Sequence, residues 1–370
     1  GLAKNLFISV SMVWETYPVI PIMFLIAIII LSFSKRIKQI HSNQTSNIIG
    51  NKKSVLIYIL SIIIFLGIGY GKWSRYPLRW SDAFYSTNHV ANQLAINPVL
   101  YFLNTYSWKS ESYNLNEVDK YYPYIAKCIG VVNNNDSSYT LTRRIEPSKQ
   151  QITKTNIVII FLETFPTYKI GYFGNPLNPT PNFDTIARSS IIYKNFYVPK
   201  FSTAGSIFSA MTGLPDMATI NKSSTRDPFA NKQHFLLNDL KEYKKHFFIG
   251  GSANWGDLGG FFRGNVDNIE IHEEGTYPIP EINAWGISDY DLMMEANNIL
   301  KKEPEPFFSI MLTAGNHSPY TIPDIEGFIH TNYSQEYENN GFEKEEELNA
   351  FKFMDFSLGA FIDVAKKENY

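Results

Sequence analysis

Two apolar runs near the N-terminus constrain this chain more than any other feature. Residues 17–33 and 55–70 contain no charged side chain, and about 17 to 20 apolar residues are enough for a helix to cross a membrane. A buried core helix is the alternative for either run taken alone. A soluble helix of this length normally carries a polar face, so the pattern favours two transmembrane helices.

The connector between the two runs indicates how they would lie in a membrane. Residues 34–54 contain no acidic residue, and their basic residues are Lys35, Arg36, Lys38, Lys52 and Lys53. Because basic loops stay on the cytoplasmic side, we expect the chain after residue 70 to lie outside. The chain begins with Gly1, and residues 7–14 resemble the end of an earlier apolar element. We therefore expect further spans before it.

The composition excludes several classes of protein. The 370 residues carry a formal net charge of −2, so there is no broad basic surface of the kind that binds nucleic acid. Cys128 is the only cysteine, which excludes an internal disulfide and a cysteine-rich metal site. The length is sufficient for a membrane region and one sizeable globular domain.

The chain divides into a membrane region (1–74), a middle part (75–154) and an α/β part (155–370). The middle part is rich in aromatic residues, Asn and Ser, and we interpret it as juxtamembrane elements and a linker, with a helix near 89–103. In the last part apolar runs alternate with helical patterns, which predicts an α/β domain with a mostly parallel sheet covered by helices. The expected strands are 156–162, 191–197, 246–250 and 307–312, and the expected helices are 181–190, 204–211, 289–300 and 351–367.

Two polar residues fall where an α/β domain places its chemistry. Glu163 follows the first expected strand, and ligands gather outside the carboxyl ends of such strands. A carboxylate there suits Mn, Mg or Zn, unless it only caps a turn. Thr203 lies where the helix at 204–211 begins, next to free N–H groups that favour a bound phosphate. A metal beside its hydroxyl would make it a nucleophile, whereas a plain helix N-cap is the alternative.

Two further candidates lie in loops after expected strands. His317 belongs to the turn-forming stretch 313–320. It is suited to contacting a substrate phosphate or transferring a proton to a leaving group, with an exposed loop histidine as the alternative. Trp255 belongs to the glycine-rich stretch 250–257. Its ring offers a flat apolar wall for a headgroup, although structural packing explains it equally well.

The order of these motifs resembles the sulfatase-like branch of the alkaline phosphatase superfamily. Leu-Glu-Thr at 162–164 is similar to that family's first metal-ligand motif, and Thr-Pro-Asn-Phe-Asp at 180–184 is similar to the start of one of its helices. Ser-Thr at 202–203 with Met-Thr-Gly-Leu-Pro at 211–215 resembles its nucleophile segment, and residues 312–320 and 285–289 also look similar. The resemblance implies that Thr203 is the nucleophile and a metal ligand with Glu163, that His317 contacts substrate, and that Trp255 lies beside the headgroup.

Two departures from the family pattern affect these expectations. Lipoteichoic acid synthases place an arginine two residues after the tryptophan, where this chain has Asp257, so Arg263 becomes the candidate for the phosphate contact. The family also completes its metal site with an Asp-His pair on a later strand, and this chain ends at Tyr370 before such a pair. We therefore expect a catalytic domain that is truncated at its C-terminus and binds metal weakly by itself.

Within the superfamily, the chain looks most like lipoteichoic acid synthases and phosphoethanolamine transferases. This resemblance implies a multi-pass enzyme of the bacterial cytoplasmic membrane with its catalytic domain outside and with one divalent metal, Mn or Zn, Mg being the third option. The headgroup of a membrane phospholipid, phosphoglycerol or phosphoethanolamine, would pass through a phosphothreonine to a hydroxyl of an envelope glycan, lipid or polymer. A membrane-anchored phosphodiesterase or sulfatase-like hydrolase, and a non-catalytic protein that retains the fold, are the alternatives.

Overall fold

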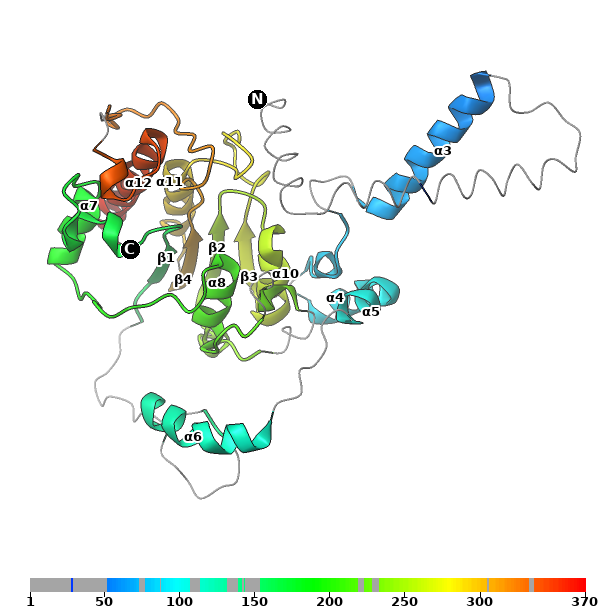
Figure 1. Ribbon diagram of the computed structural model, residues 1–370, viewed down its shortest axis with the longest axis horizontal. Coiled ribbons are helices and arrows are strands. Elements are labelled where there is room, and N and C mark those ends of the chain that lie inside the picture. Colours follow the sequence, from blue (N-terminus) through cyan, green and yellow to red (C-terminus); the bar gives the residue numbers. More distant parts are fainter. Residues whose placement is uncertain are drawn as a thin grey trace, which may run out of the picture.

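The computed structural model of the protein describes residues 28, 52–72, 77–86, 88–106, 114–131, 139–141, 143, 154–218, 223–227, 233–304, 306–332 and 336–370. Figure 1 shows a central sheet flanked by helices. The strands are β1 (Ile157–Phe161), β2 (Lys244–Ile249), β3 (Ile269–His272) and β4 (Phe307–Leu312). The α-helices are α3 (Lys52–Tyr70), α4 (His89–Ala95), α5 (Pro98–Tyr106), α6 (Leu115–Ile129), α7 (Pro181–Arg188), α8 (Thr203–Thr212), α9 (Leu236–Asp239), α10 (Leu258–Asn265), α11 (Asp289–Leu300) and α12 (Glu345–Glu368).

The described strands form one parallel sheet in the order β1-β4-β2-β3. Leu312 at the end of β4 pairs with Phe161 at the end of β1 and with Ile249 at the end of β2. The carboxyl ends of these three strands therefore meet at one edge of the sheet. This arrangement confirms the predicted α/β domain with a parallel sheet.

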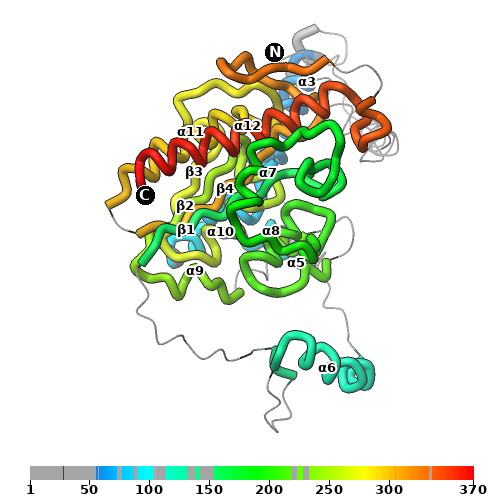
Figure 2. The backbone as a smooth tube through the Cα atoms, turned by 90° about the vertical axis from the view of Figure 1, so that its left-hand side faces the viewer, coloured from blue at the N-terminus to red at the C-terminus, as the bar shows by residue number. Residues whose placement is uncertain are grey.

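Helices cover both faces of the sheet. Phe247 and Ile310 face a core cluster that includes residues of α8, α9 and α10. Phe248 and Met311, the next residues in the same strands, face a second cluster with residues of α11 and α12. Because side chains alternate along a strand, β2 and β4 are buried on both sides, which explains their apolar sequences. Figure 2 shows the two groups of helices on opposite sides of the strands.

Most of the expected elements are confirmed. The strands at 156–162, 246–250 and 307–312 correspond to β1, β2 and β4, and the helices at 181–190, 204–211 and 289–300 correspond to α7, α8 and α11. The helix near 89–103 is divided into α4 and α5, and Pro98 is the first residue of α5, a position that suits proline. Helix α12 begins earlier than residue 351, and its first turn holds three glutamates, which favour a helix N-terminus.

The strand expected at 191–197 is wrong. The structure has no strand at these residues, and Ile191, Tyr193, Phe196 and Tyr197 are exposed. β-branched and aromatic residues favour strands mainly because they pack well against neighbours on a sheet. These side chains point into solvent, where no such packing is available, so their composition alone does not produce a strand.

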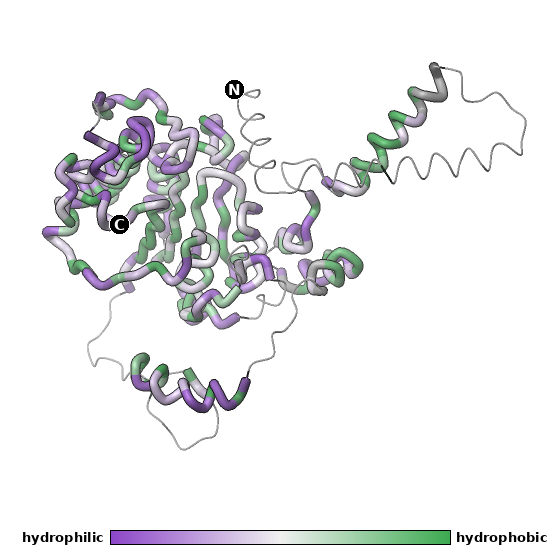
Figure 3. Tube along the Cα trace, viewed as in Figure 1, coloured by the Kyte–Doolittle hydropathy of each residue, from purple (hydrophilic) through white to green (hydrophobic). Residues whose placement is uncertain are grey.

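The two apolar runs have different outcomes. The run at 17–33 lies outside the described residues apart from residue 28. The run at 55–70 is helical, since it belongs to α3, and the green colour of this helix in Figure 3 shows its apolar character. Its described large apolar side chains, such as Leu56 and Phe65, are exposed. Within the described part of the chain, no helix combines the length and the apolar character needed to cross a membrane.

The segment that follows α3 packs on the α/β domain. Arg79 Nη1 donates to Asp257 Oδ1 at 2.7 Å and to the backbone oxygen of Asn254 at 2.8 Å. Trp80 is only 3% exposed. A side chain at Gly260 would collide with Ser81, since its Cβ would lie 2.5 Å from the Ser81 Cβ. Part of the predicted linker is therefore held against α10 and the turn before it.

Candidate active site

Glu163, Thr203 and His317 lie far apart in the sequence but meet at the carboxyl edge of the sheet. Glu163 follows β1, His317 lies in the loop after β4, and Thr203 is the first residue of α8. Because every residue of β1 pairs with β4 up to the last residue of both strands, the loops that follow them emerge next to each other. The fold thus brings together three of the residues that the sequence analysis singled out.

The Glu163 carboxylate contacts both other side chains. Thr203 Oγ1 donates a hydrogen bond to Glu163 Oε2 at 2.7 Å, and His317 Nε2 lies 3.5 Å from Glu163 Oε1. The Glu163 side chain is 11% exposed and the His317 side chain is 31% exposed. The carboxylate is therefore largely shielded from water, which strengthens its polar contacts, whereas the imidazole remains accessible to a ligand.

Hydrogen bonds connect the turn after β1 to the loop after β4. The backbone N–H of Glu163 donates to Thr313 Oγ1 at 2.9 Å. Asn316 Nδ2 donates to the backbone oxygen of Thr164 at 2.8 Å. These bonds fix Glu163 relative to the loop that carries His317.

Helix α8 places Thr203 at its N-terminus. Ser202 caps the helix, since its Oγ accepts a hydrogen bond from the Gly205 N–H at 3.2 Å, and capping of this kind defines where a helix begins. The helix ends at Gly213, which is in the left-handed conformation. The Thr203 hydroxyl therefore lies beside the positive end of the helix dipole, where an anion such as a phosphate is favoured.

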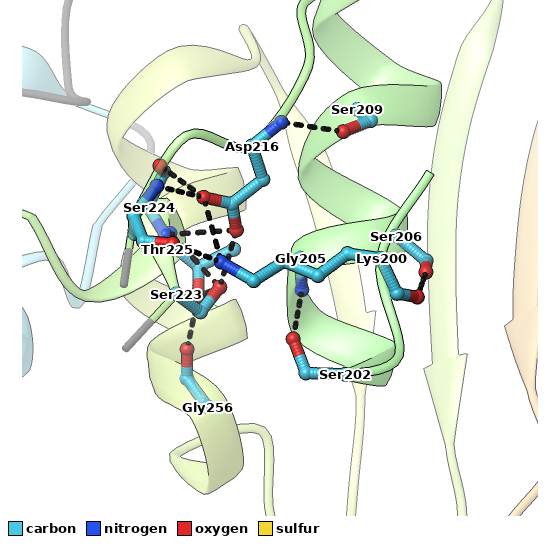
Figure 4. Close-up of polar contacts among 11 residues, drawn as sticks. Lys200, Ser202, Gly205, Ser206, Ser209, Asp216, Ser223, Ser224, Thr225 and Gly256 are labelled. Carbon is cyan, nitrogen blue, oxygen red and sulfur yellow. Dashed lines mark hydrogen bonds and ion pairs between the residues drawn. The ribbon is translucent and has the colours of Figure 1, made fainter. Parts of the chain in front are cut away.

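A polar network lies beside this helix start (Figure 4). Lys200 Nζ lies 3.2 Å from Asp216 Oδ1, and Ser224 donates to the same carboxylate through its hydroxyl at 2.7 Å. Burial tends to raise the pKa of Asp216, but hydrogen bonds from Ser224, Ala218 and Lys200 outweigh it and lower the pKa. Thr225 Oγ1 donates to the backbone oxygen of Gly256 at 2.6 Å. The network thus joins the start of α8 to the turn that holds Trp255.

Trp285 supports the His317 ring. The two rings stack with their centroids 4.3 Å apart and an angle of 18° between planes. The indole Nε1–H donates to the backbone oxygen of Ser318 at 2.9 Å. Trp285 therefore contacts both the face of the imidazole and the backbone of its loop, which fixes the direction of Nε2.

Asp289, the first residue of α11, holds the same loop from the other side. Its Oδ1 accepts hydrogen bonds from the backbone N–H groups of Ala314 at 2.9 Å and Gly315 at 3.1 Å. Burial raises the pKa of Asp289 to about 6, although these two N–H groups act in the opposite direction. Among the described residues, the hydrogen bonds of the Asp289 carboxylate go to the loop backbone, so we assign it a positioning role.

A close approach of two backbones determines where Trp285 lies. A Cβ at Gly286 would overlap the carbonyl oxygen of Gly250, and a Cβ at Gly251 would lie 2.5 Å from the backbone oxygen of Trp285. Gly286 also has a φ of +105°, which side chains rarely permit. We refer to this contact between 250–251 and 285–286 as the glycine seam.

Comparison with known proteins identifies the family. The sequence model of the sulfatase family, described as "Sulfatase", matches residues 155–370. The chain belongs to the sulfatase family. The sulfatase-family domain therefore includes Glu163, Thr203, Trp285, Asp289 and His317.

Several individual proteins are similar to this sulfatase-family chain. A lipoteichoic acid synthase from Staphylococcus saprophyticus is 23% identical over 359 residues, which cover 84% of this chain and 52% of the relative. One from Staphylococcus aureus is 21% identical over 377 residues, covering 88% and 56%. A crystal structure of an alkaline phosphatase superfamily protein from Vibrio parahaemolyticus has a TM-score of 0.57 and 28% identity, covering 68% of this chain and 60% of that one. The chain spans about half the length of the curated relatives it matches.

Trp255 and Arg263 of the sulfatase-family chain lie on the β2 side of the site. Trp255 is partly buried against the core cluster of α8 and α10, and the next residue, Gly256, abuts Ala204 at the start of α8. Arg263 Nη2 lies 3.5 Å from Glu273 Oε1, which follows β3. Asp257 is paired with Arg79. Trp255 is thus on an element that touches helix α8, whereas the Arg263 guanidinium contacts an acidic residue.

Two groups of side chains in the described part of the sulfatase-family chain could hold a metal ion. Glu163 and Thr203 offer oxygen atoms 2.7 Å apart, a donor set that suits Mn, Mg or Zn. His246, Glu270 and His272 form a second group, which the sequence analysis missed because its members come from two strands. Burial lowers the pKa of both histidines, that of His272 to about 4, so their rings are neutral at pH 7.

Proposed function

We propose that this chain is part of a transferase that moves a phospholipid headgroup through a covalent intermediate on Thr203. The observation that supports this proposal most strongly is the pair of contacts that Glu163 makes with Thr203 at 2.7 Å and with His317 at 3.5 Å. A hydroxyl nucleophile, a proton acceptor and a second proton-transferring group within reach of one another are what such a reaction requires. The relatives named above are synthases, which favours transfer over hydrolysis.

In the first half-reaction, the Thr203 oxygen attacks the phosphorus of the donor phospholipid. The Thr203–phosphorus bond forms and the bond to the diacylglycerol oxygen breaks. The hydroxyl proton passes to Glu163 Oε2, to which it is already hydrogen-bonded, and His317 gives a proton to the departing oxygen. The products are diacylglycerol and a Thr203 that carries phosphoglycerol or phosphoethanolamine.

In the second half-reaction, the hydroxyl of an envelope glycan, lipid or polymer attacks the same phosphorus. His317 accepts the proton of this hydroxyl, and the Thr203 oxygen leaves and recovers a proton from Glu163. Trp285 keeps the imidazole aligned through the stacked contact at 4.3 Å. Trp255 and Arg263 are the proposed headgroup contacts, and Arg263 would first have to separate from Glu273.

One divalent metal, Mn or Zn with Mg as a third option, would be held by Glu163 and Thr203. Their two oxygens fit such an ion in kind and in spacing. When bound, it would stabilise negative charge on the Thr203 oxygen and on the phosphoryl oxygens.

We also propose that the enzyme is anchored in the bacterial cytoplasmic membrane, with the catalytic domain outside. The charge-free runs at 17–33 and 55–70, with a basic connector between them, support this topology. Anchoring would hold the site beside a donor that stays in the bilayer and so raise its effective concentration. The acceptor would be a hydroxyl group of the cell envelope.

The test is peptide-mapping mass spectrometry of full-length protein taken from its native membrane. Wild-type protein should carry an added phosphoglycerol or phosphoethanolamine mass on Thr203 and release diacylglycerol in a burst. Thr203→Ala should lose both signals. Thr212→Ala, at the other end of the same helix, is the matched control and should retain them. A bare Thr203 in both wild type and His317→Ala would overturn the proposal.

A further inference from the structure

The second group of metal-ligand side chains lies on strands β2 and β3, away from Glu163. His246 pairs in register with Glu270, and Phe248 pairs with His272. Since alternate residues of a strand point to the same face, Glu270 and His272 share a face with each other and with His246 on the adjacent strand. A Glu-x-His pair on one strand and a histidine on its neighbour form a compact three-ligand arrangement.

The distances within this cluster suit a small metal ion. His246 Nδ1 lies 3.2 Å from His272 Nε2 and 3.9 Å from Glu270 Oε2. Tetrahedral Zn with bonds of about 2.0–2.1 Å holds its ligand atoms roughly 3.3–3.4 Å apart. The two nitrogens already have this separation. All three ligand atoms lie within 4.8 Å of one another, and the Glu270 side chain is 56% exposed, so it has room to move towards the two nitrogens.

The burial of His246 distinguishes this cluster from a chance surface grouping. His246 is fully buried, and its Nε2 lacks a hydrogen-bond partner among the described residues. The nearest carboxylate oxygen, Glu303 Oε1, lies 3.4 Å from Nε2. A histidine that binds a metal through one nitrogen commonly presents the other to a carboxylate, which fixes its tautomer. Glu303 occupies this outer position, and Nδ1 is left for a metal.

The rings are also held in place by their neighbours. Phe248 stacks on His272 with centroids 4.4 Å apart and an angle of 12°. His246 stacks on the same phenylalanine at 5.8 Å and 20°. Because both imidazoles are packed against one aromatic ring, their nitrogens would stay aligned without a metal, so binding would require little rearrangement.

We propose that His246, His272 and Glu270 form a second, independent site for a divalent transition metal, with Zn as the preferred ion. Two nitrogens and one carboxylate oxygen are ligands that Zn favours. A solvent molecule would complete the tetrahedron on the exposed Glu270 side. The site has a structural role, since it joins β3, at the end of the strand order, to β2. The proposal does not depend on the reaction at Thr203.

The test measures Zn binding by the intact, chelator-treated chain in a Glu163→Gln background, which weakens the site at Thr203. Competition with a chromophoric chelator should give one bound Zn per chain, and Zn should raise the Tm. Adding His272→Gln or Glu270→Gln should weaken Zn binding at least tenfold and remove the Tm increase. His234→Gln, at an exposed histidine beside Asp239, is the control and should leave both signals unchanged.

Cobalt provides an independent measurement, because tetrahedral Co²⁺ absorbs visible light strongly. We expect a tetrahedral Co²⁺ spectrum in the Glu163→Gln protein and its loss in the Glu163→Gln, His272→Gln protein. If the Glu163→Gln protein binds neither ion, or if His272→Gln leaves the affinity unchanged, the proposal is wrong. The contact at 3.2 Å would then be a plain hydrogen bond between the two imidazoles.

Discussion

The Glu163 carboxylate divides its two oxygens between different partners: Thr203 donates to Oε2, whereas the Thr164 hydroxyl donates to Oε1 at 3.0 Å and His317 Nε2 lies 3.5 Å from Oε1. This division makes the alignment of the imidazole as important as its presence, because a rotated ring would lose its contact with Oε1. Trp285 and Asp289 support this alignment, since Trp285 stacks on the imidazole and Asp289 accepts a hydrogen bond from the backbone of its loop. The residue-scale predictions therefore concern these two supports.

Replacing Trp285 with Leu should slow headgroup transfer without unfolding the protein. An aromatic stacking contact contributes about 1 kcal/mol, which corresponds to roughly a fivefold loss of rate. Trp285→Phe retains a stacking ring but not the indole N–H, and should keep most of the activity. The measurement is kcat with a lipid donor, alongside the Tm of each variant. Equal kcat values for the Leu variant and wild type would show that Trp285 does not hold the His317 ring in its working orientation.

Asp289 should make stability depend on pH in an acidic range. Its pKa is about 6 in the folded protein and about 4 in an unfolded chain, so the folded state binds the proton more tightly. The stabilisation is complete below about pH 4 and is lost as the pH rises towards 6; it amounts to roughly 3 kcal/mol at most. Asp289→Asn keeps an oxygen for Ala314 and Gly315 and does not titrate.

Unfolding by denaturant at several pH values checks this prediction. The free energy of unfolding of wild type should fall relative to that of Asp289→Asn between pH 4 and 6. Curves that stay parallel across this range would show that Asp289 does not titrate as described.

The sequence analysis singled out Glu163, Thr203 and His317 with a role for each, but it noted residues 285–289 only as a resemblance and gave Trp285 and Asp289 no role. Glu163, Thr203 and His317 each follow an apolar strand or open a helix, and such positions have a known place in an α/β fold. Trp285 and Asp289 act through contacts with residues about 30 positions away. No local pattern encodes contacts of this kind, so only the folded chain reveals them.

At the scale of elements, the start of α7 depends on a residue of another helix. Thr180 precedes α7 but makes no side-chain capping bond. Instead, Asp355 of α12 accepts hydrogen bonds from the backbone N–H groups of Asn182 at 3.0 Å and Phe183 at 2.7 Å. The Asp355 carboxylate, which is 1% exposed, therefore caps α7 across the packed interface.

Asp355→Ala should lower the free energy of unfolding by about 2 kcal/mol, because it leaves buried N–H groups without an acceptor. Asp363→Ala, at an exposed position of the same helix, should change it by less than about 0.5 kcal/mol. Denaturant unfolding of both variants provides the comparison. If both variants lost a similar free energy of unfolding, the loss would come from a general weakening of α12 and not from the missing cap of α7.

Among the strands, those with continuous apolar sequences were predictable, and β3 was not. Strands β2 and β4 are buried on both faces, and their sequences show it. Strand β3 (Ile269–His272) alternates apolar and polar residues over only four positions and lies at the end of the strand order. A pattern this short cannot be distinguished from that of a loop. Residues 191–197, by contrast, have the composition of a strand, but they do not form one because no neighbouring strand packs against them.

At the scale of the whole molecule, the chain between α3 and the α/β domain is partly integrated into that domain. Arg79 contributes a guanidinium to Asp257, whose side chain is 6% exposed. Trp80 stacks edge-on with Phe84 and Tyr101. The segment that would connect a membrane anchor to the catalytic domain therefore touches the loop of Trp255 directly.

Arg79→Asp should release this segment, because it places two carboxylates together at a mostly buried position. Limited digestion with chymotrypsin should then cut at Trp80 and Phe84, which are protected in wild type. Adding Asp257→Arg should restore part of the protection. Lys154→Asp removes an exposed ion pair with Glu242 and should not affect the cleavage pattern. If the Arg79→Asp protein resisted chymotrypsin as fully as wild type, the ion pair with Asp257 would not be what holds this segment on the α/β domain.

The glycine seam has a consequence for how the protein can change by mutation. The Cα of Gly286 faces the carbonyl oxygen of Gly250, and the Cα of Gly251 faces that of Trp285. Neither position therefore has room for a side chain larger than a hydrogen atom. A substitution there would displace Trp285 and, through it, the imidazole, although neither glycine carries a side chain that could react. We expect the loss of activity across a set of substitutions at 251 to follow the volume of the new side chain, and to be indifferent to its charge or polarity.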